Sequence, residues 1–311
     1  CWCLLASIEF IMKPKQSLHP KNRHQGRYDF DALEKACPEL KKFVRLNPYD
    51  PSLGKTIDFS QADAVKCLNK ALLRLYYGIS FWDLPKGALC PPIPGRVDYI
   101  HYLADLLSKN LSSLKGSKVN VLDVGSGANC IYPLLGVKAY AWHFVASDID
   151  ESSLENAQKI VNENALDESI ELRKQVNAKN VFKGIIQEKD SFALTMCNPP
   201  FHSSKEEAAS GSLRKWKNLG KDKGKNPKQT LNFGGVSNEL WCEGGEKSFV
   251  SIMIEESKIF QKQVLWFSTL VSKGENLHHF KELLKKAKAT KVEIIEMGQG
   301  QKVSRILAWK F

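Results

Sequence analysis

The sequence predicts an α/β fold, in which a mostly parallel sheet carries helices on both faces and follows a small helical N-terminal domain. After Arg96, short apolar runs rich in β-branched and aromatic residues alternate with stretches of helical length, the pattern of a parallel sheet with crossover helices. Before Arg96, a stretch with helical spacing ends at a proline-rich linker. The 311 residues, of which 43% are hydrophobic, are enough for one or two domains.

The bulk composition points to an acidic partner. A net charge of +11 favours nucleic acid as that partner, with a membrane surface second. The alternative is a basic but otherwise ordinary enzyme. The eight cysteines form no C-x-x-C pair, so we expect no metal site and a reducing, cytoplasmic location. No apolar run approaches the roughly 18 residues that a membrane span requires, so we expect no contact with a membrane.

The first residues divide into two segments. Residues 1–12 are expected to be an upstream or non-native extension, because Met12 would make a natural initiator and no signal-peptide cleavage site precedes it. Residues 13–27 contain five cations, no acid and no apolar periodicity, which indicates an extended basic arm that binds RNA, or else a solvated tail. The cations of this arm are Lys13, Lys15, Lys21, Arg23 and Arg27.

Residues 28–95 are expected to form the helical domain and its linker. Ser60, with Asp63 three residues later, has the spacing of a capping box, and Gly78 is placed to end the helix. Apolar residues recur between them at helical spacing. These residues are Ala64, Val65, Leu68, Leu72, Leu75 and Tyr76.

Residues 96–311 are expected to form the sheet domain. Helices are predicted at 97–107, 153–165 and 246–260, and strands at 119–124, 143–149, 169–174, 192–198 and 263–271. Two final strands, joined by a turn at Gly298–Gly300, must be antiparallel because no helix separates them. That ending is unusual for nucleotide-binding sheets and usual for methyltransferases, so the predicted fold is a Rossmann-like class I methyltransferase sheet with an antiparallel last strand.

A glycine turn follows the first predicted strand of this sheet. Asp123, Gly125 and Gly127 stand at its end, where glycine allows a tight turn and a close approach of the backbone to a ligand. Cys130 occupies the position of the third glycine of the dinucleotide fingerprint, which makes packing over a pyrophosphate less favourable.

Two acids stand at the end of the second predicted strand. Asp148 and Asp150 lie about 20 residues beyond the glycine turn, where a carboxylate accepts hydrogen bonds from ribose hydroxyls. A ligand with a ribose and without a pyrophosphate fits this pair of features, and S-adenosylmethionine is such a ligand. The alternative is an ordinary strand-end aspartate beside a loop glycine.

The sequence Asn198-Pro199-Pro200-Phe201 follows the fourth predicted strand. Two prolines fix an extended turn and donate no hydrogen bonds, so the turn presents oxygen acceptors. The Asn198 side chain and a proline carbonyl could together hold both hydrogens of an amino group, and Phe201 could stack on a base. The alternative is a purely structural turn.

Residues 202–235 form a long polar segment with seven lysines and one arginine against three acidic residues. Loops of this length are usually functional or disordered. Arg214, Lys215 and Lys217 surround Trp216, so we expect a basic flexible loop that binds RNA phosphates.

Several stretches closely resemble the bacterial ribosomal RNA large-subunit methyltransferase F family. They are KPKQSLHPKNRHQGRYDFDALEKACPEL, LCPPIPGRVDYIHYLADLL, VGSGANCIYPLLGV, CNPPF, LNFGG and ELWCEGGE. The resemblance covers about residues 13–311. Members of the family are 23S rRNA adenine-N6 methyltransferases, and they are relatives of the eukaryotic methyltransferase-like protein sixteen.

The resemblance implies S-adenosylmethionine as the cofactor and one adenine of 23S rRNA as the target, in free rRNA or in an assembling large ribosomal subunit. It implies that Asn198–Phe201 form the catalytic pocket and that Gly125 and Asp148 contact the cofactor. It also implies that Arg96 contacts the cofactor from the start of the helix that follows the proline-rich linker. A monomer is expected. Alternatives are methylation of guanine N2 or of a protein glutamine, and an RNA-binding protein with a degenerate cofactor site.

Overall fold

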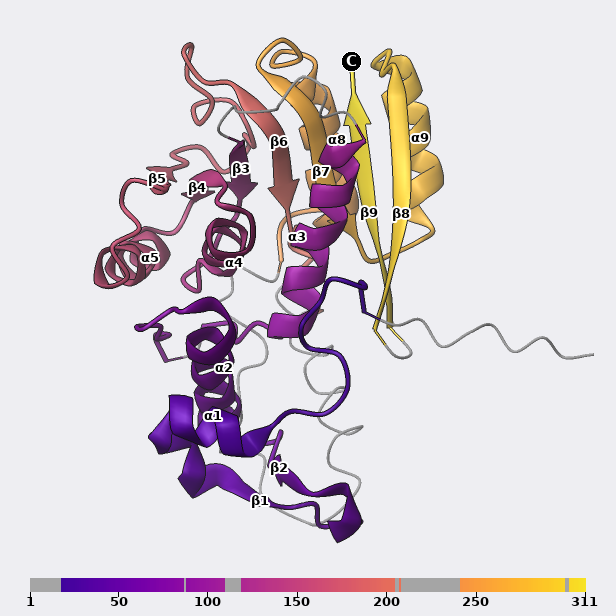
Figure 1. The fold of residues 1–311 in the computed structure, drawn as a ribbon. Coiled ribbons are helices and arrows are strands. Elements are labelled where there is room, and N and C mark those ends of the chain that lie inside the picture. The colour runs from indigo at the N-terminus through magenta and orange to yellow at the C-terminus, as the bar shows by residue number, and fades with distance from the viewer. Residues whose placement is uncertain (1–17, 87, 110–118, 205–206, 208–240, 300–301) are drawn as a thin grey trace, which may run out of the picture.

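The computed structural model describes residues 18–86, 88–109, 119–204, 207, 241–299 and 302–311. Within this part of the chain, a seven-stranded sheet stands above a smaller N-terminal module (Figure 1). The arrowheads of the parallel strands point toward the module, so their carboxyl ends lie close to it. No helix of the described part is long and apolar enough to cross a membrane.

The N-terminal module combines two α-helices with a small hairpin. Its elements are α1 (Phe30–Ala36), η1 (Pro38–Phe43), β1 (Val44–Leu46), η2 (Pro51–Leu53), β2 (Lys55–Ile57) and α2 (Ala62–Tyr77). Strands β1 and β2 are antiparallel. The hairpin and α1 were not predicted from the sequence.

Helix α2 confirms the expected helix but not its expected start. The residue before its first turn is Gln61, and no side chain caps the helix. The Ser60 hydroxyl instead donates to the carboxylate of Asp58, at 2.5 Å. The predicted capping box is therefore wrong. Gly78 ends the helix in the left-handed conformation, as predicted.

The large sheet has the order β5-β4-β3-β6-β7-β9-β8. Its strands are β3 (Asn120–Val124), β4 (His143–Asp148), β5 (Ile170–Lys174), β6 (Phe192–Cys197), β7 (Val264–Val271), β8 (Lys291–Gln299) and β9 (Lys302–Lys310). The pairs from β5 to β7 are parallel, whereas β9 is antiparallel to both β7 and β8. The predicted sheet with an antiparallel end is confirmed. Gly298 lies within β8, opposite Val303, so the expected turn at Gly298–Gly300 begins too early.

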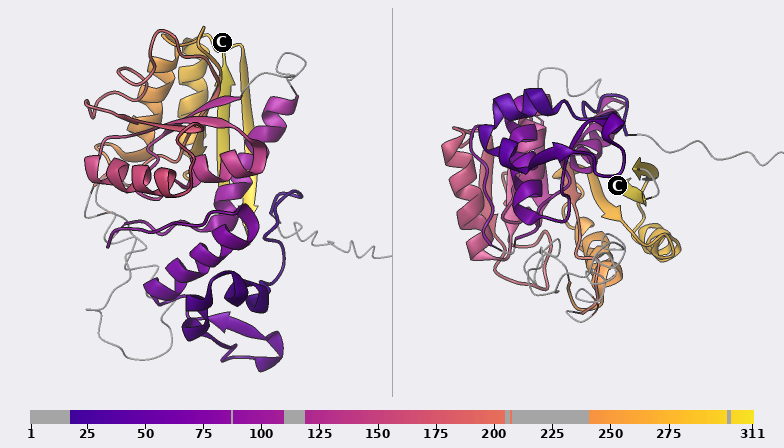
Figure 2. Two further views of the ribbon diagram at one scale, coloured as in Figure 1. Left: turned by 60° about the vertical axis from the view of Figure 1, so that its left-hand side comes forward. Right: turned by 90° about the horizontal axis from the view of Figure 1, so that it is seen from below.

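Helices cover both faces of the sheet (Figures 1 and 2). They are α3 (Ile93–Ser108), α4 (Ile131–Tyr140), α5 (Glu151–Glu163), α8 (Gly245–Ser257) and α9 (Asn276–Lys286). One hydrophobic core holds buried residues of α3, α4 and α5, and a second core holds those of α8 and α9. Helices α4 and α9 were not predicted.

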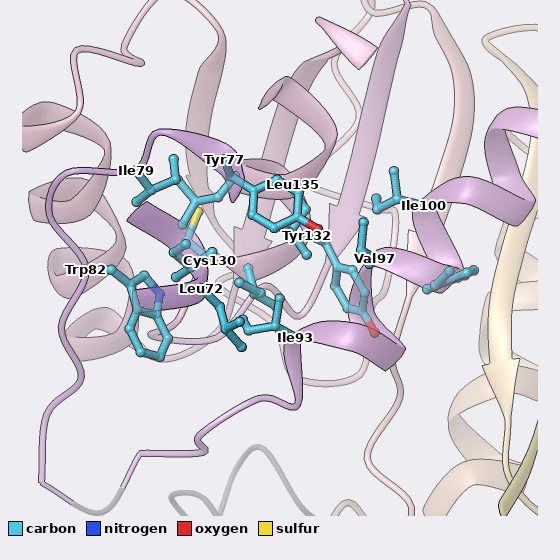
Figure 3. Close-up of a cluster of buried hydrophobic side chains, with 14 of the residues drawn as sticks. Leu72, Tyr77, Ile79, Trp82, Ile93, Val97, Ile100, Cys130, Tyr132 and Leu135 are labelled. Carbon is cyan, nitrogen blue, oxygen red and sulfur yellow. The ribbon is translucent and has the colours of Figure 1, made fainter. Parts of the chain in front are cut away.

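The first of these cores is shared with the N-terminal module. Leu72 of α2, Ile93 and Val97 of α3, and Leu135 of α4 are buried in one cluster (Figure 3). Because α3 begins at Ile93, the boundary expected between residues 95 and 96 falls inside a helix. The N-terminal module is therefore packed directly onto the end of the sheet domain where the parallel strands finish.

Residues 18–27 are held against α2 and α3 by three buried side chains, although most of the segment is exposed. His19, Asn22 and His24 are buried, and these residues lie along α3 and α2. From residue 18 onwards the segment is therefore anchored by these three side chains rather than free along its whole length, and its described cations are exposed. Lys13 and Lys15 lie outside the described residues.

Candidate active site

Three strands of the sheet finish in one row. Val124 of β3 is paired with Ser147 of β4 and with Cys197 of β6. The next residues along each strand are Asp148 in β4, Asn198 after β6 and Gly125 after β3. The structure thus places these three side by side at the carboxyl edge of the sheet, where open α/β sheets bind their ligands.

The glycine turn is built by backbone bonds to β4. The N–H groups of Gly125 and Ser126 donate to the Ser147 carbonyl, at 2.9 and 3.0 Å. Gly125 and Gly127 have φ values of 73° and 63°, a conformation that glycine adopts without strain. The Gly127 N–H donates to the Asp148 carboxylate at 2.8 Å, so this acid fixes the turn.

Asp148 and Asp150 have different surroundings. Burial raises the pKa of Asp148, although its carboxylate accepts from the backbone N–H groups of Asp150 and Gly127. The Asp150 carboxylate accepts from Ser153 N–H at 2.8 Å and caps α5. Its hydrogen bonds, first of all that from Ser152, lower its pKa. Asp150 therefore serves the helix, and Asp148 is the acid that faces the glycine turn.

Asp123 is the most unusual group at this edge of the sheet. Its side chain is fully buried, and neither carboxyl oxygen has a hydrogen-bond partner. Burial raises its pKa to about 8, the negative charge of Asp148 adds to the rise, and Arg96 opposes it. A buried carboxyl group without a partner is costly, and such groups are rare. A positively charged ligand group would satisfy it.

Arg96 carries the complementary charge. It lies in the first turn of α3, where its Nη1 donates to the Tyr132 hydroxyl at 2.6 Å and its guanidinium lies 5.3 Å from the centre of the Tyr132 ring. Its Nε is buried without a partner, as is the Ser126 hydroxyl of the glycine turn. The site therefore offers an unpaired acid, an unpaired guanidinium nitrogen and an unpaired hydroxyl, which together suit a ligand with an ammonium and a carboxylate.

The Asn-Pro-Pro-Phe turn leaves a fully buried strand, β6. Pro199 is buried, whereas Asn198, Pro200 and Phe201 are half-exposed. Tyr99 of α3 supports the strand end, because its hydroxyl accepts from the Cys197 N–H at 3.4 Å and lies 3.0 Å from the Ser268 hydroxyl. Helix α3, which also carries Arg96, thus contacts the last residue of the strand before the turn.

The described part of the stretch ELWCEGGE, residues 241–246, closes the other side of this turn. His202 forms a parallel bridge with Trp241, and the Cys242 N–H donates to the His202 carbonyl at 3.1 Å. Gly245 has φ 59°, and a Cβ atom there would lie 3.1 Å from the Ser203 nitrogen. Glycine is therefore required for the close approach of α8 to the chain after Phe201.

Glu246, in the same stretch, was not identified from the sequence as a site residue. It is buried, and its carboxylate accepts from the N–H and hydroxyl of Ser272 and from the Asn276 side chain at 2.8 Å. It therefore ties the start of α8 to the loop after β7. The only signal for it in the sequence is its place in ELWCEGGE, one of the stretches that resemble the methyltransferase family, because no periodicity marks it.

Only some of the predicted RNA-binding cations lie within the described residues. Lys21, Arg23 and Arg27 are exposed on the N-terminal segment. Lys21 forms an ion pair with Asp105, and the two arginines donate to backbone carbonyls of the N-terminal module. Arg214, Lys215 and Lys217 lie outside the described residues. Among the described residues, no group of three or more His, Cys, Asp or Glu could hold a metal ion.

Comparisons with known proteins agree with this geometry. A family model described as RNA methyltransferase matches residues 12–311. The protein named ribosomal RNA large subunit methyltransferase F is 55% identical in Pseudomonas fluorescens (strain Pf0-1) over 302 residues, covering 96% of this chain and 88% of that protein. The protein of the same name from Desulfotalea psychrophila is 55% identical over 296 residues, with 94% of each chain covered.

Solved structures give the same result. The catalytic domain of human METTL16 in complex with MAT2A 3′UTR hairpin 1 superposes with a TM-score of 0.78 and 32% identity, covering 95% of this chain and 96% of that chain. The N-terminal domain of human METTL16 in complex with SAH superposes with a TM-score of 0.73 and 29% identity, covering 94% and 98%.

Proposed function

Because the chain belongs to the ribosomal RNA large subunit methyltransferase F family, whose members are S-adenosylmethionine-dependent RNA methyltransferases, we propose that it methylates the N6 amine of one adenine in 23S rRNA. The observation that carries this proposal is the strand register that places Asn198 beside Gly125 and Asp148. A cofactor cradle and an acceptor for an amino group therefore share one edge of the sheet.

We assign the cofactor to the unpaired groups of that edge. Asp123 would hold its ammonium group and Arg96 its carboxylate, because each side chain has a buried, unpaired polar atom of the complementary charge. Gly125 and Gly127 would let the backbone approach the ligand, and Asp148 would accept from its ribose. S-adenosylmethionine supplies an electrophilic methyl group on a positively charged sulfur.

The target amine would be held by the Asn-Pro-Pro-Phe turn. The Asn198 side-chain oxygen and the Pro199 carbonyl accept the two amine hydrogens, which turns the nitrogen lone pair out of the ring plane toward the methyl group. Pro200 keeps the turn extended, and Phe201 stacks on the base. Such a turn would activate the amine by geometry. The amine nitrogen would accept the methyl group as the bond between methyl carbon and sulfur breaks, which leaves a neutral thioether, and the nitrogen would lose one proton to solvent.

The RNA would lie across the N-terminal module and the basic loop. We propose contacts from the cations of residues 13–27 and from Arg214, Lys215 and Lys217. The partner is 23S rRNA or an assembling large ribosomal subunit, met by a monomeric enzyme in the cytoplasm. Guanine N2 or a protein glutamine could also enter such a turn, and the exposed Arg23 and Arg27 favour RNA over a protein substrate.

The role of Asn198 is tested by Asn198→Ala. We expect kcat for methyl transfer to large-subunit rRNA to fall by about 10²–10³, the cost of removing one oriented polar group from a reacting centre. The Kd for S-adenosylhomocysteine is expected to stay within about threefold. Asn120→Ala is the matched control, because Asn120 is an exposed amide at the opposite edge of the same sheet. Near wild-type turnover by a folded Asn198→Ala protein would refute the assignment.

A further inference from the structure

The first turn of α3, which carries Arg96, is weak by its own sequence. The residue before the helix is Pro92, and no side chain caps the helix start. Gly95 lies in the turn itself, and glycine in a helix is about 1 kcal/mol less favourable than alanine, whereas Pro94 is well tolerated in a first turn. The backbone under Arg96 therefore depends on contacts from outside the helix.

Those contacts come from the N-terminal segment. The Asn22 side-chain nitrogen donates to the Pro94 carbonyl at 2.9 Å and to the Asp98 carboxylate. The His19 backbone N–H donates to the same carboxylate oxygen at 3.1 Å. Pro94 and Asp98 stand two residues before and two residues after Arg96, so Asn22 bridges the turn on both sides of it.

These bonds are shielded from water. The exposed fractions of His19, Asn22 and Asp98 are 3%, 4% and 2%. A buried polar group that loses its partner keeps the full cost of its desolvation, so the bonds are costly to break. The hydrogen bonds of Asn22 therefore stabilise the first turn of α3 more than those of an exposed side chain would.

The segment that presents Asn22 is hydrogen-bonded within itself, and a separate contact ties it to α2. The His19 carbonyl accepts from the Asn22 N–H at 2.8 Å, and the Asn22 side-chain oxygen accepts from the His24 N–H at 2.8 Å. The His24 ring lies 2.9 Å from the Tyr77 hydroxyl of α2. We name residues 19–24 the arm clamp.

We propose that the arm clamp positions Arg96, through Asn22, and so sets the affinity of the enzyme for its cofactor. This inference rests on the cofactor role proposed above for Arg96. The basic arm, which the sequence predicts to bind RNA, would then have a second role. Its exposed cations would face RNA, while its buried Asn22 would hold the helix turn that faces the cofactor site.

The test is a double-mutant cycle read by titration calorimetry with S-adenosylhomocysteine. Asn22→Ala is expected to weaken binding about tenfold, which corresponds to about 1.4 kcal/mol. Arg96→Ala is expected to weaken it at least as much. If Asn22 acts through Arg96, adding Asn22→Ala to Arg96→Ala changes Kd by less than about twofold, because coupled residues are not additive.

Tyr77→Phe is the matched control. It removes the bond between the arm clamp and α2 and leaves the Asn22 bonds to α3 in place. We expect a loss of thermal stability similar to that of Asn22→Ala and an unchanged Kd. Should Asn22→Ala not fold, Asn22→Gln keeps the amide, moves it by one methylene and carries the same expectation.

Two results overturn the inference, and they are distinguishable. An equal effect of Asn22→Ala with and without Arg96, or no effect at all, refutes the arm clamp and leaves the role of Arg96 standing. An unchanged Kd for Arg96→Ala refutes the cofactor role of Arg96 and the arm clamp together.

Discussion

Replacing Asp123 by asparagine is expected to stabilise the free protein while it weakens cofactor binding. The carboxyl group is fully buried and has no hydrogen-bond partner, so the folded protein resists its ionisation. Burial raises its pKa to about 8. In the unfolded chain an aspartate has a pKa of about 3.9.

The size of the effect follows from these two pKa values. Between them the folded protein keeps a proton that the unfolded chain releases, so the free energy of unfolding of the wild type falls by about 1.4 kcal/mol per pH unit. Above pH 8 the fall stops. Asparagine does not titrate, so the variant lacks this decline. The stability of Asp123→Asn relative to wild type should therefore rise by on the order of 2 kcal/mol between pH 6 and pH 8.

The assay is urea unfolding, followed by tryptophan fluorescence at pH 6, 7 and 8, with the cofactor absent. The cost of burying the asparagine amide changes the difference in the free energy of unfolding between variant and wild type by the same amount at every pH. The dependence of that difference on pH is therefore unchanged. Asp150→Asn is the control, because asparagine caps a helix as well as aspartate does. A difference between Asp123→Asn and wild type that does not change with pH would refute the reasoning. Loss of S-adenosylhomocysteine binding in the same variant is expected, since the partner of the ammonium is removed.

Two further predictions concern stability and RNA binding. Glu256→Gln should lower the free energy of unfolding by about 1–3 kcal/mol, because the buried Glu256 carboxylate accepts from three successive backbone N–H groups. The neighbouring Glu255→Gln is the control and should change the free energy of unfolding by less than about 0.5 kcal/mol. Equal losses for the two variants in urea unfolding would contradict this prediction. Replacing Lys13 and Lys15 by alanine should reduce the slope of log affinity for RNA against log salt by about 1.5, as two lost phosphate contacts require. An unchanged slope in filter binding would mean that these lysines do not meet phosphates.

The carboxyl edge of the sheet could be predicted from the sequence because its signals are local. The glycine turn, Asp148 and Asn198 each follow a recognisable apolar strand. Parallel strands bring their carboxyl ends to one edge, so strand order alone places the three together. The register of β3 with β4 and β6 confirms this placement.

The supports of the site could not be predicted, because their partners are distant in sequence. Glu256 reads as surface charge beside Glu255, yet its carboxylate binds backbone groups about 75 residues away. Asn22 reads as part of a polar tail and meets Pro94, 72 residues away. Helix α4 was missed because it is apolar on nearly all sides, being buried between the module and the sheet, so it has no amphipathic period.

Methylation of an adenine N6 amine in large-subunit rRNA is the activity that we propose for this enzyme. The direct test is transfer of a labelled methyl group from S-adenosylmethionine to unmodified 23S rRNA, followed by nucleoside mass spectrometry. We expect N6-methyladenosine to carry the label. Label in N2-methylguanosine would agree with the proposed role of the Asn-Pro-Pro-Phe turn but contradict adenine as the target base. Label in added ribosomal protein but not in RNA would contradict RNA as the substrate.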